Sequence, residues 1–422
     1  MSTATKTPGP RDPATEARTM RAQQVSRLWM LISIVAIMMV SFVRIATDAN
    51  GLTSTGTIRA AIVATCPILM AGIGGLWAER SGVVNIGLEG QMILGTWGAA
   101  YFTYFYGPWI GILGAALLGA IGGLLHALAT VTFGVDHIVS GVAINIIGLG
   151  ASKFLAEAYF RDLEGGGIKQ LTGLDTPTRV TVPGISDAAS NIAGHHWFVV
   201  SDLASFVAAL TTKMSLYTVL VALLVVASGW ILWRTTFGLR LRSCGENPAA
   251  AESLGVNVYR YKYAAVMTSG AMAGVGGGYL ALVASSGFTT GQTNGRGYIG
   301  LAAMIFGNWR PGGTAAGALL FGYTDSLRLR DATSIHALVL VVAIGLLGLA
   351  LLRLVQKRRT TAILMAVIGG AFLLWYLTTD QVPVEFAGMT PYVATLLVLA
   401  LATQRLRMPT ADGLRYRRGQ SI

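Results

Sequence analysis

Apolar runs separated by short polar or basic stretches make up most of the chain. Most runs are close to the ~20 residues that an α-helix needs to cross a hydrocarbon core of about 30 Å. They lie at roughly 28–47, 57–78, 83–106, 109–133, 137–157, 214–234, 261–284, 297–309, 312–326, 334–352, 360–378 and 391–405. This pattern predicts an all-α polytopic membrane protein with about 10 to 12 transmembrane helices.

Two stretches do not fit a simple crossing. The run 297–309 is short for a span at ~1.5 Å per residue, which favours a broken or re-entrant helix. The polar segment 158–213 contains an apolar stretch at 197–210 that is also too short. We expect a helix there to lie along the membrane interface.

Composition agrees with a membrane protein, because 53% of the residues are hydrophobic and only 12% are charged. The 53 glycines are scattered through the apolar runs, which in membrane proteins indicates close helix packing. Gly270, Gly274 and Gly278 recur at every fourth position of one run and predict such a packing face.

Basic residues determine the predicted orientation. They concentrate in the tail 1–27, the loop 235–262, the connection 353–359 and the tail 406–422, and such an excess marks the cytoplasmic side. The charges of 158–213 are balanced, which places that segment outside. Both termini of the membrane domain 28–405 are therefore predicted to be cytoplasmic. The net charge of +12 comes mainly from these loops and tails, which meet anionic lipid, so it does not indicate nucleic-acid binding.

The loop 235–262 holds the clearest local signal. Asn247 and Pro248 are typical of an N-cap and a first helical position, and Gly255 is placed to end a helix. The alanine-rich residues between them favour a short helix. A capped helix on a loop too small for an enzyme domain suits docking of a soluble partner. The alternative is a merely structured loop between two spans.

Polar side chains also occur inside apolar runs. Asn85 and Glu89 are four residues apart, so on a helix they would share one face. A carboxylate near the middle of a membrane indicates a functional site. Asn294 and Arg296 precede the short run 297–309, and Gly-interrupted short segments in two halves of a chain point to a transport path.

Asn145 lies in the middle of a predicted span. It either joins this path or makes a hydrogen bond between helices, and the sequence does not distinguish the two.

Several chemistries are not indicated. No lysine follows a glycine, so the chain has no P-loop and is not expected to hydrolyse ATP, and the H-E-x-x-H and G-x-S-x-G motifs are absent too. His195 and His196 lack a third ligand nearby in the sequence, so no metal is predicted. Cys66 and Cys244 are expected at different depths, which argues against a disulfide. We therefore expect a transport protein rather than an enzyme.

Four stretches resemble bacterial ABC-importer permeases of the ribose and branched-chain amino-acid permease family, nucleoside-type branch. They are ERSGVVNIGLEGQM (79–92), GENPAAAESLGVNV (245–258), GYIGLAAMIFGNWRP (297–311) and PYVATLLVLAL (391–401). The resemblance covers roughly 57–330 and 385–418. The tail 1–50 and the hairpin 334–380 look additional to compact family members.

The resemblance implies that the loop carries the coupling helix, which sits in a groove of the ATP-binding subunit. The residues carried over to that contact are Glu246, Asn247, Pro248, Ala250, Ala251, Leu254 and Gly255. Asn85, Glu89, Asn145, Asn294 and Arg296 are the hypothetical path residues. The implied assembly has a second permease subunit, an extracellular substrate-binding lipoprotein and a partner that binds the ATP, with no cofactor on this chain.

The function expected from this resemblance is import of nucleosides across the bacterial cell membrane. Ribose-like sugars are an alternative substrate class. A stand-alone secondary transporter that couples an ion gradient through Glu89 is an alternative of a different class, but it leaves the capped cytoplasmic helix unexplained.

Overall fold

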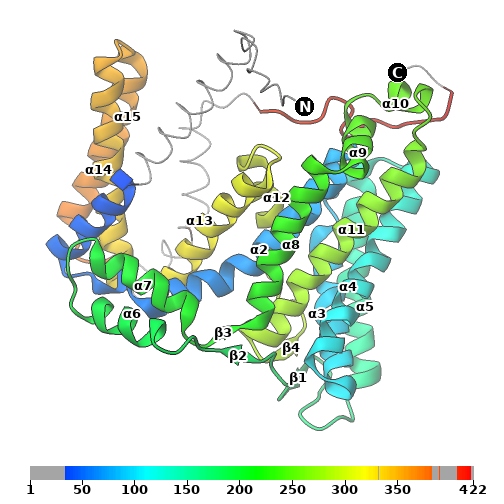
Figure 1. The fold of residues 1–422 in the computed structure, drawn as a ribbon, viewed down its shortest axis with the longest axis horizontal. Coiled ribbons are helices and arrows are strands. Elements are labelled where there is room, and N and C mark those ends of the chain that lie inside the picture. Colours follow the sequence, from blue (N-terminus) through cyan, green and yellow to red (C-terminus); the bar gives the residue numbers. More distant parts are fainter. Residues whose placement is uncertain (1–33, 331, 383–388, 390–405, 420–422) are drawn as a thin grey trace, which may run out of the picture. The chain divides into compact units, whose positions relative to one another are not determined.

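The computed structural model describes residues 34–330, 332–382, 389 and 406–419, which are mainly helical (Figure 1). The all-α membrane class is confirmed, since seven of the described helices are long and apolar enough to cross a membrane. These are α2 (Thr55–Arg80), α4 with its π-turn (Pro108–Thr132), α5 (His137–Phe160), α8 (Leu216–Arg234), α11 with its π-turn (Val258–Ala284), α14 (from Ser334 to Val355) and α15 (Arg359–Thr378). The predicted run 391–405 lies outside the described residues.

The remaining helices are shorter or more polar. They are a helix at Ile34–Thr47, η1 (Asn50–Thr53), α3 (Leu88–Tyr106), α6 (Ile185–Gly194), α7 (Val200–Thr211), α9 (Thr236–Glu246), α10 (Pro248–Ser253), α12 (Arg296–Phe306) and α13 (Pro311–Arg330). α4 ends in the π-turn η2 (Leu128–Thr132) and α11 ends in η3 (Leu280–Ala284), while α14 begins at Ala332. The predicted short segments 197–210 and 297–309 correspond to α7 and α12.

The described chain divides into two compact units. One contains residues up to 54, 191–205 and 333–382, and the other contains 55–190, 206–332 and the C-terminal part from 383. The first unit thus combines the two regions that look additional in the sequence with part of the segment 158–213. The sequence did not predict this association.

The core of the larger unit is a set of helices packed through glycine. α4 and α11 lie against one another so closely that a Cβ on Gly270 would overlap the carbonyl oxygen of Gly119. A Cβ on Gly274 would likewise overlap the carbonyl oxygen of Ala115. The predicted packing face on α11 is confirmed, and its partner is α4.

Two short antiparallel ladders join the loops at one end of this unit. β1 (Gln170–Thr172) pairs with β4 (Gly287–Thr289), and β2 (Arg179–Val180) pairs with β3 (Met214–Ser215). The first ladder ties the segment 158–213 to the chain just before α12. Because backbone N–H and C=O groups need partners, these ladders order a loop that is otherwise poor in regular structure.

The predicted run 83–106 is helical only from Leu88, where α3 begins, and residues 81–87 form no helix. The sequence indicates such a break, since Gly82, Gly87 and Gly90 allow the backbone to unwind. Asn85 therefore does not share a helix face with Glu89. Gly82 explains part of the break, because its φ of +83° is in the left-handed region that favours glycine.

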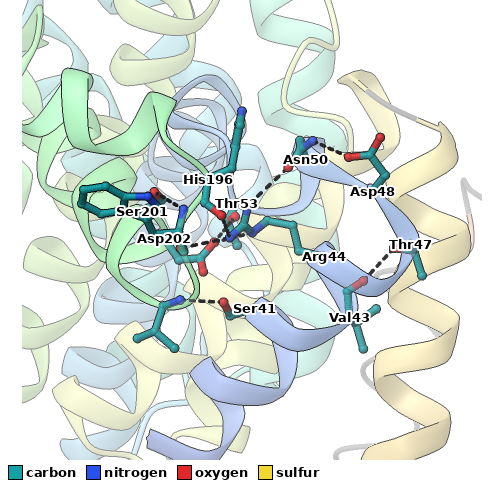
Figure 2. A network of polar contacts seen from close by, with 12 residues as sticks. Ser41, Val43, Arg44, Thr47, Asp48, Asn50, Thr53, His196, Ser201 and Asp202 are labelled. Atoms are coloured by element: carbon teal, nitrogen blue, oxygen red, sulfur yellow. Dashed lines mark hydrogen bonds and ion pairs between the residues drawn. The ribbon is translucent and has the colours of Figure 1, made fainter.

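A buried ion pair organises the smaller unit (Figure 2). Arg44, from the helix at Ile34–Thr47, lies 2.9 Å from Asp202 of α7, with side-chain exposures of 2% and 7%. Arg44 also donates to the carbonyl oxygens of His196 and Trp197, at 3.2 and 3.3 Å. Thr53 donates to Asp202 as well. These contacts bind the helix at Ile34–Thr47 to residues 196–202 of the segment 158–213.

We expect Arg44→Met alone to destabilise the protein by about 3–5 kcal/mol, because it leaves the Asp202 carboxylate buried without its countercharge. Arg44→Met combined with Asp202→Leu should recover most of the loss. The measurement is the melting temperature of the detergent-purified protein. A single variant as stable as the double variant would show that the ion pair does not hold this unit together.

Candidate functional site

The predicted helix in the loop 235–262 is present as α10. Asn247 is its N-cap, and the Asn247 side chain accepts a hydrogen bond from the Ala250 N–H at 2.9 Å. Pro248 occupies the first helical turn, and Gly255 follows the helix with a φ of +79°. The local sequence predicts where this helix begins and ends, because a cap, a proline and a left-handed glycine act within a few residues.

The two faces of α10 differ. Pro248 and Ala251 are buried against the rest of the unit. Ala250 is exposed, and Leu254 is 85% exposed directly after the helix. An apolar side chain so open to its surroundings at the end of a capped helix is typical of a contact surface. Glu246, just before the helix, is also exposed and lies 4.0 Å from Arg80.

The C-terminal segment 406–419 runs along the same end of the unit, beside α9 and α10 (Figure 1). The Ala411 N–H donates to the Gly245 carbonyl at 2.9 Å, and the Thr410 hydroxyl donates to Glu246 at 3.1 Å. Sequence reasoning interpreted this tail only as a charge that sets orientation. Tyr416, a single tyrosine inside its basic run, was a signal that could have drawn attention to it.

A buried polar cluster lies beneath this tail. Glu79, 4% exposed at the end of α2, accepts a hydrogen bond from the Trp309 indole N–H at 2.5 Å. Arg80 donates to the Trp309 carbonyl at 3.1 and 2.7 Å. Both carboxyl oxygens of Asp412 are buried without a hydrogen-bond partner among the described residues. Burial raises the pKa of this carboxyl, because the charged form is poorly solvated there.

Glu89 connects α3 to the start of α12. One carboxylate oxygen accepts from the Thr293 hydroxyl at 2.6 Å and the Gly295 N–H at 2.9 Å, and the other accepts from the Gly297 N–H at 2.7 Å. A carboxylate at this position satisfies orphan amides of the helix and complements its dipole. Glu89 is thus an anchor for the short helix, with both oxygens occupied.

The other predicted path residues differ in their surroundings. Asn85 is fully buried and donates to Gln91 at 2.9 Å and to Ser269 at 2.8 Å, so it belongs to an interior network. Asn294 is exposed, with a φ of +45° in the turn before α12. Arg296 is paired with Asp325 at 3.2 Å.

Asn145 bridges three elements. Its side-chain oxygen accepts from the Gly90 N–H at 2.7 Å, and its amide donates to the Ile86 carbonyl at 3.1 Å and to the Tyr298 hydroxyl at 2.9 Å. Tyr298 is 47% exposed. The interhelical hydrogen bond is therefore present, and Asn145 also lies next to an exposed polar side chain. Tyr298 was not singled out from the sequence.

Two histidines missed by sequence reasoning complete the irregular segment 81–87. The ring of His126 lies 3.0 Å from the Val84 carbonyl and 2.8 Å from the Ser140 hydroxyl. The Val84 N–H donates to the His137 ring at 3.3 Å. In the sequence each of these histidines looks like an ordinary helical residue, because its hydrogen-bond partner, the Val84 backbone, is distant in the chain.

Comparison with known proteins identifies the family. The model of the permease component of branched-chain amino acid transport systems matches residues 57–351. The chain belongs to this permease family. The prediction from the four motifs is confirmed, and the permease is a multi-pass cell membrane protein that acts as a transport component.

Similar proteins include named ABC permeases. The guanosine ABC transporter permease protein NupQ of Bacillus subtilis is 33% identical over 372 residues, which cover 86% of this chain and 97% of the relative. The nucleoside ABC transporter permease protein NupC of Lactococcus lactis is 34% identical over 362 residues, covering 84% and 94%. The putative glucose ABC transporter permease protein TsgC13 of Haloferax volcanii is 31% identical over 284 residues, covering 66% and 78%. No solved structure matches the chain.

Replacing Glu89 by glutamine should reduce transport and stability. The glutamine amide nitrogen is itself a donor and would face one of these N–H or hydroxyl donors. The mismatch should lower the free energy of unfolding by about 1–3 kcal/mol. Uptake by cells and the melting temperature of the purified protein measure the two effects. Glu157→Gln, an exposed position on α5, is the matched control. Full transport and stability of Glu89→Gln would mean that the carboxylate does not anchor α12.

The Asp412 carboxyl should make stability depend on pH. Burial raises its pKa from 3.8 to about 7, so the folded state holds a proton that the unfolded state releases. This contribution is fully present below the unfolded pKa, and it is lost as the pH rises through the folded value. The stability of Asp412→Asn should therefore equal that of the wild type at about pH 4 and exceed it at about pH 8.

Melting temperatures across that range test the prediction. The exposed Asp162→Asn serves as a control that should run parallel to the wild type. A constant difference between Asp412→Asn and the wild type at every pH would contradict it.

Proposed function

We propose that the permease is the transmembrane subunit of an ATP-binding-cassette importer for nucleosides. Membership of the permease family and the names of two similar proteins, a guanosine permease and a nucleoside permease, support this substrate class. An ATP-binding subunit would supply the ATP hydrolysis, because the sequence has no P-loop. A second permease subunit and an external binding lipoprotein would complete the assembly.

The observation that carries the proposal is the geometry of α10. A six-residue helix with a side-chain cap, a buried inner face and the exposed Ala250 and Leu254 presents a firm projection from the membrane domain. The basic loop around it is predicted to be cytoplasmic, where an ATP-binding subunit would lie. In the proposed mechanism, ATP binding moves that subunit, and α10 transmits the motion to the helices that carry the path.

The proposed path passes α12. Asn294 and Tyr298 offer exposed polar groups, and Asn145 joins them through Tyr298. Neutral hydrogen-bonding groups of this kind suit a nucleoside, which carries donors and acceptors but no net charge. Asn85, Glu89 and Arg296 are supporting residues in this scheme, since each is occupied by contacts within the unit.

Uptake of labelled nucleosides by cells lacking this gene tests the proposal. The wild type should restore uptake, and Ala250→Glu should lower it by about tenfold or more, because docking would bury an unpaired charge. Ala250→Ser is the matched control and should transport normally. Membrane levels and co-purification of the ATP-binding subunit are measured for each variant.

Three results would overturn the proposal or its substrate class. Normal uptake with Ala250→Glu would remove the docking role of α10. Uptake that continues without ATP but stops when the ion gradient is dissipated would favour a secondary transporter. Competition by unlabelled glucose or ribose, but not by nucleosides, would show that the substrate is a sugar. This comparison is needed because a putative glucose permease is among the similar proteins.

A further inference from the structure

The C-terminal segment 406–419, which we call the strap, contacts α10 at its far end as well as at its start. Glu252, in the last turn of α10, accepts from the Tyr416 hydroxyl at 2.6 Å, the Arg418 guanidinium at 3.0 Å and the Gly419 N–H at 3.4 Å. Tyr416 anchors the strap, because its ring is buried with Cys244, Ala251 and Val258.

The strap also contacts elements other than α10. The Tyr416 ring lies 5.7 Å from that of Tyr259, and the Lys262 ammonium lies 5.8 Å above the Tyr416 ring. Farther back, the Arg407 N–H donates to the Asn308 side chain at 2.7 Å. The strap is therefore fixed to α11 and to the turn between α12 and α13 before it reaches Glu252.

α10 needs such support. A helix of six residues is well below the ~12–15 residues at which isolated helices become even marginal in water. Its cap fixes the start, but at the other end Gly255 leads straight into a loop. Surface ion pairs are individually weak, yet Glu252 has several donors at once, and one of them is a buried tyrosine. These contacts hold the pKa of Glu252 below its ordinary value, chiefly through the Tyr416 hydroxyl.

We propose that the strap fixes α10 in its docking position, with Tyr416 and Arg418 as positioning residues that act through Glu252. This inference rests on the proposed function. The strap joins α10 to the turn after α12, and the Ala411 carbonyl of the strap lies against Gly82, two residues after the end of α2. A force applied to α10 by the ATP-binding subunit thus reaches two helices of the membrane domain through one continuous set of contacts.

The test loosens the strap without removing it. Tyr416→Phe with Arg418→Ala removes the two side-chain donors to Glu252, leaves the Gly419 N–H and keeps the buried ring. The matched control is Tyr259→Phe with Arg417→Ala, which also loses one tyrosine hydroxyl and one guanidinium, but at neighbouring residues that do not donate to Glu252. A spin label on Ser253→Cys reports the mobility of α10, because Ser253 is exposed while Cys66 and Cys244 are buried and do not compete for the label.

We expect the label to become more mobile in the loosened variant but not in the control. In the assembled importer, the substrate transported per ATP hydrolysed should fall by about tenfold, as the loss of charged hydrogen bonds implies. The amount of ATP-binding subunit bound should change little. Glu252→Arg alone should also lower the transport per ATP, and adding Arg418→Glu to it should restore part of that coupling. A merely structural defect would not be repaired by exchanging the two charges.

Unchanged label mobility in the loosened variant would overturn the positioning role. Raised mobility with normal transport per ATP would overturn the coupling role. Ala250→Glu, measured in parallel, separates these results from failure of the proposed function. If that variant transports normally, docking through α10 is wrong, and the mobility measurement still decides whether the strap holds the helix.

Discussion

The break in the helical backbone between α2 and α3 is the constraint on which the larger unit depends. A buried stretch without helical hydrogen bonds must find other partners for its N–H and C=O groups. Here they come from α4 through His126, from α5 through His137 and Asn145, and from α11 through the long contact of Lys262 with the Gly82 carbonyl. Three helices are therefore aligned around one irregular segment.

The same segment connects the two candidate regions. At one end it follows Glu79, which contacts Trp309, and its Gly82 lies against the Ala411 carbonyl of the strap. At the other end it leads to Glu89, which caps α12. Motion at the proposed docking surface and motion near the proposed path are thus joined by a short covalent stretch and by its hydrogen-bond partners. The contacts make a continuous physical connection, which is the minimum that coupling between the two regions requires.

The sequence predicted features that arise from local chemistry. The membrane class, the short α12, the hairpin of α14 and α15 and the capped α10 follow from hydrophobic length, caps and glycine placement. It failed where the partner is distant in the chain. Asn85 and Glu89 would share a face only if the stretch between them were helical, and the break at 81–87, which Gly82 and Gly87 permit, separates them. The contacts of Tyr416 and Glu252 join segments more than a hundred residues apart.

The glycine contact between α4 and α11 limits how this protein can change shape. With carbonyl oxygens lying where a methyl group would be, the two helices have no layer of side chains that could repack as one slides past the other. The two helices must therefore move together as one rigid body. Any alternation between outward and inward openings then depends on rotation of α4 and α11 as a pair, with bending confined to the segments at their ends.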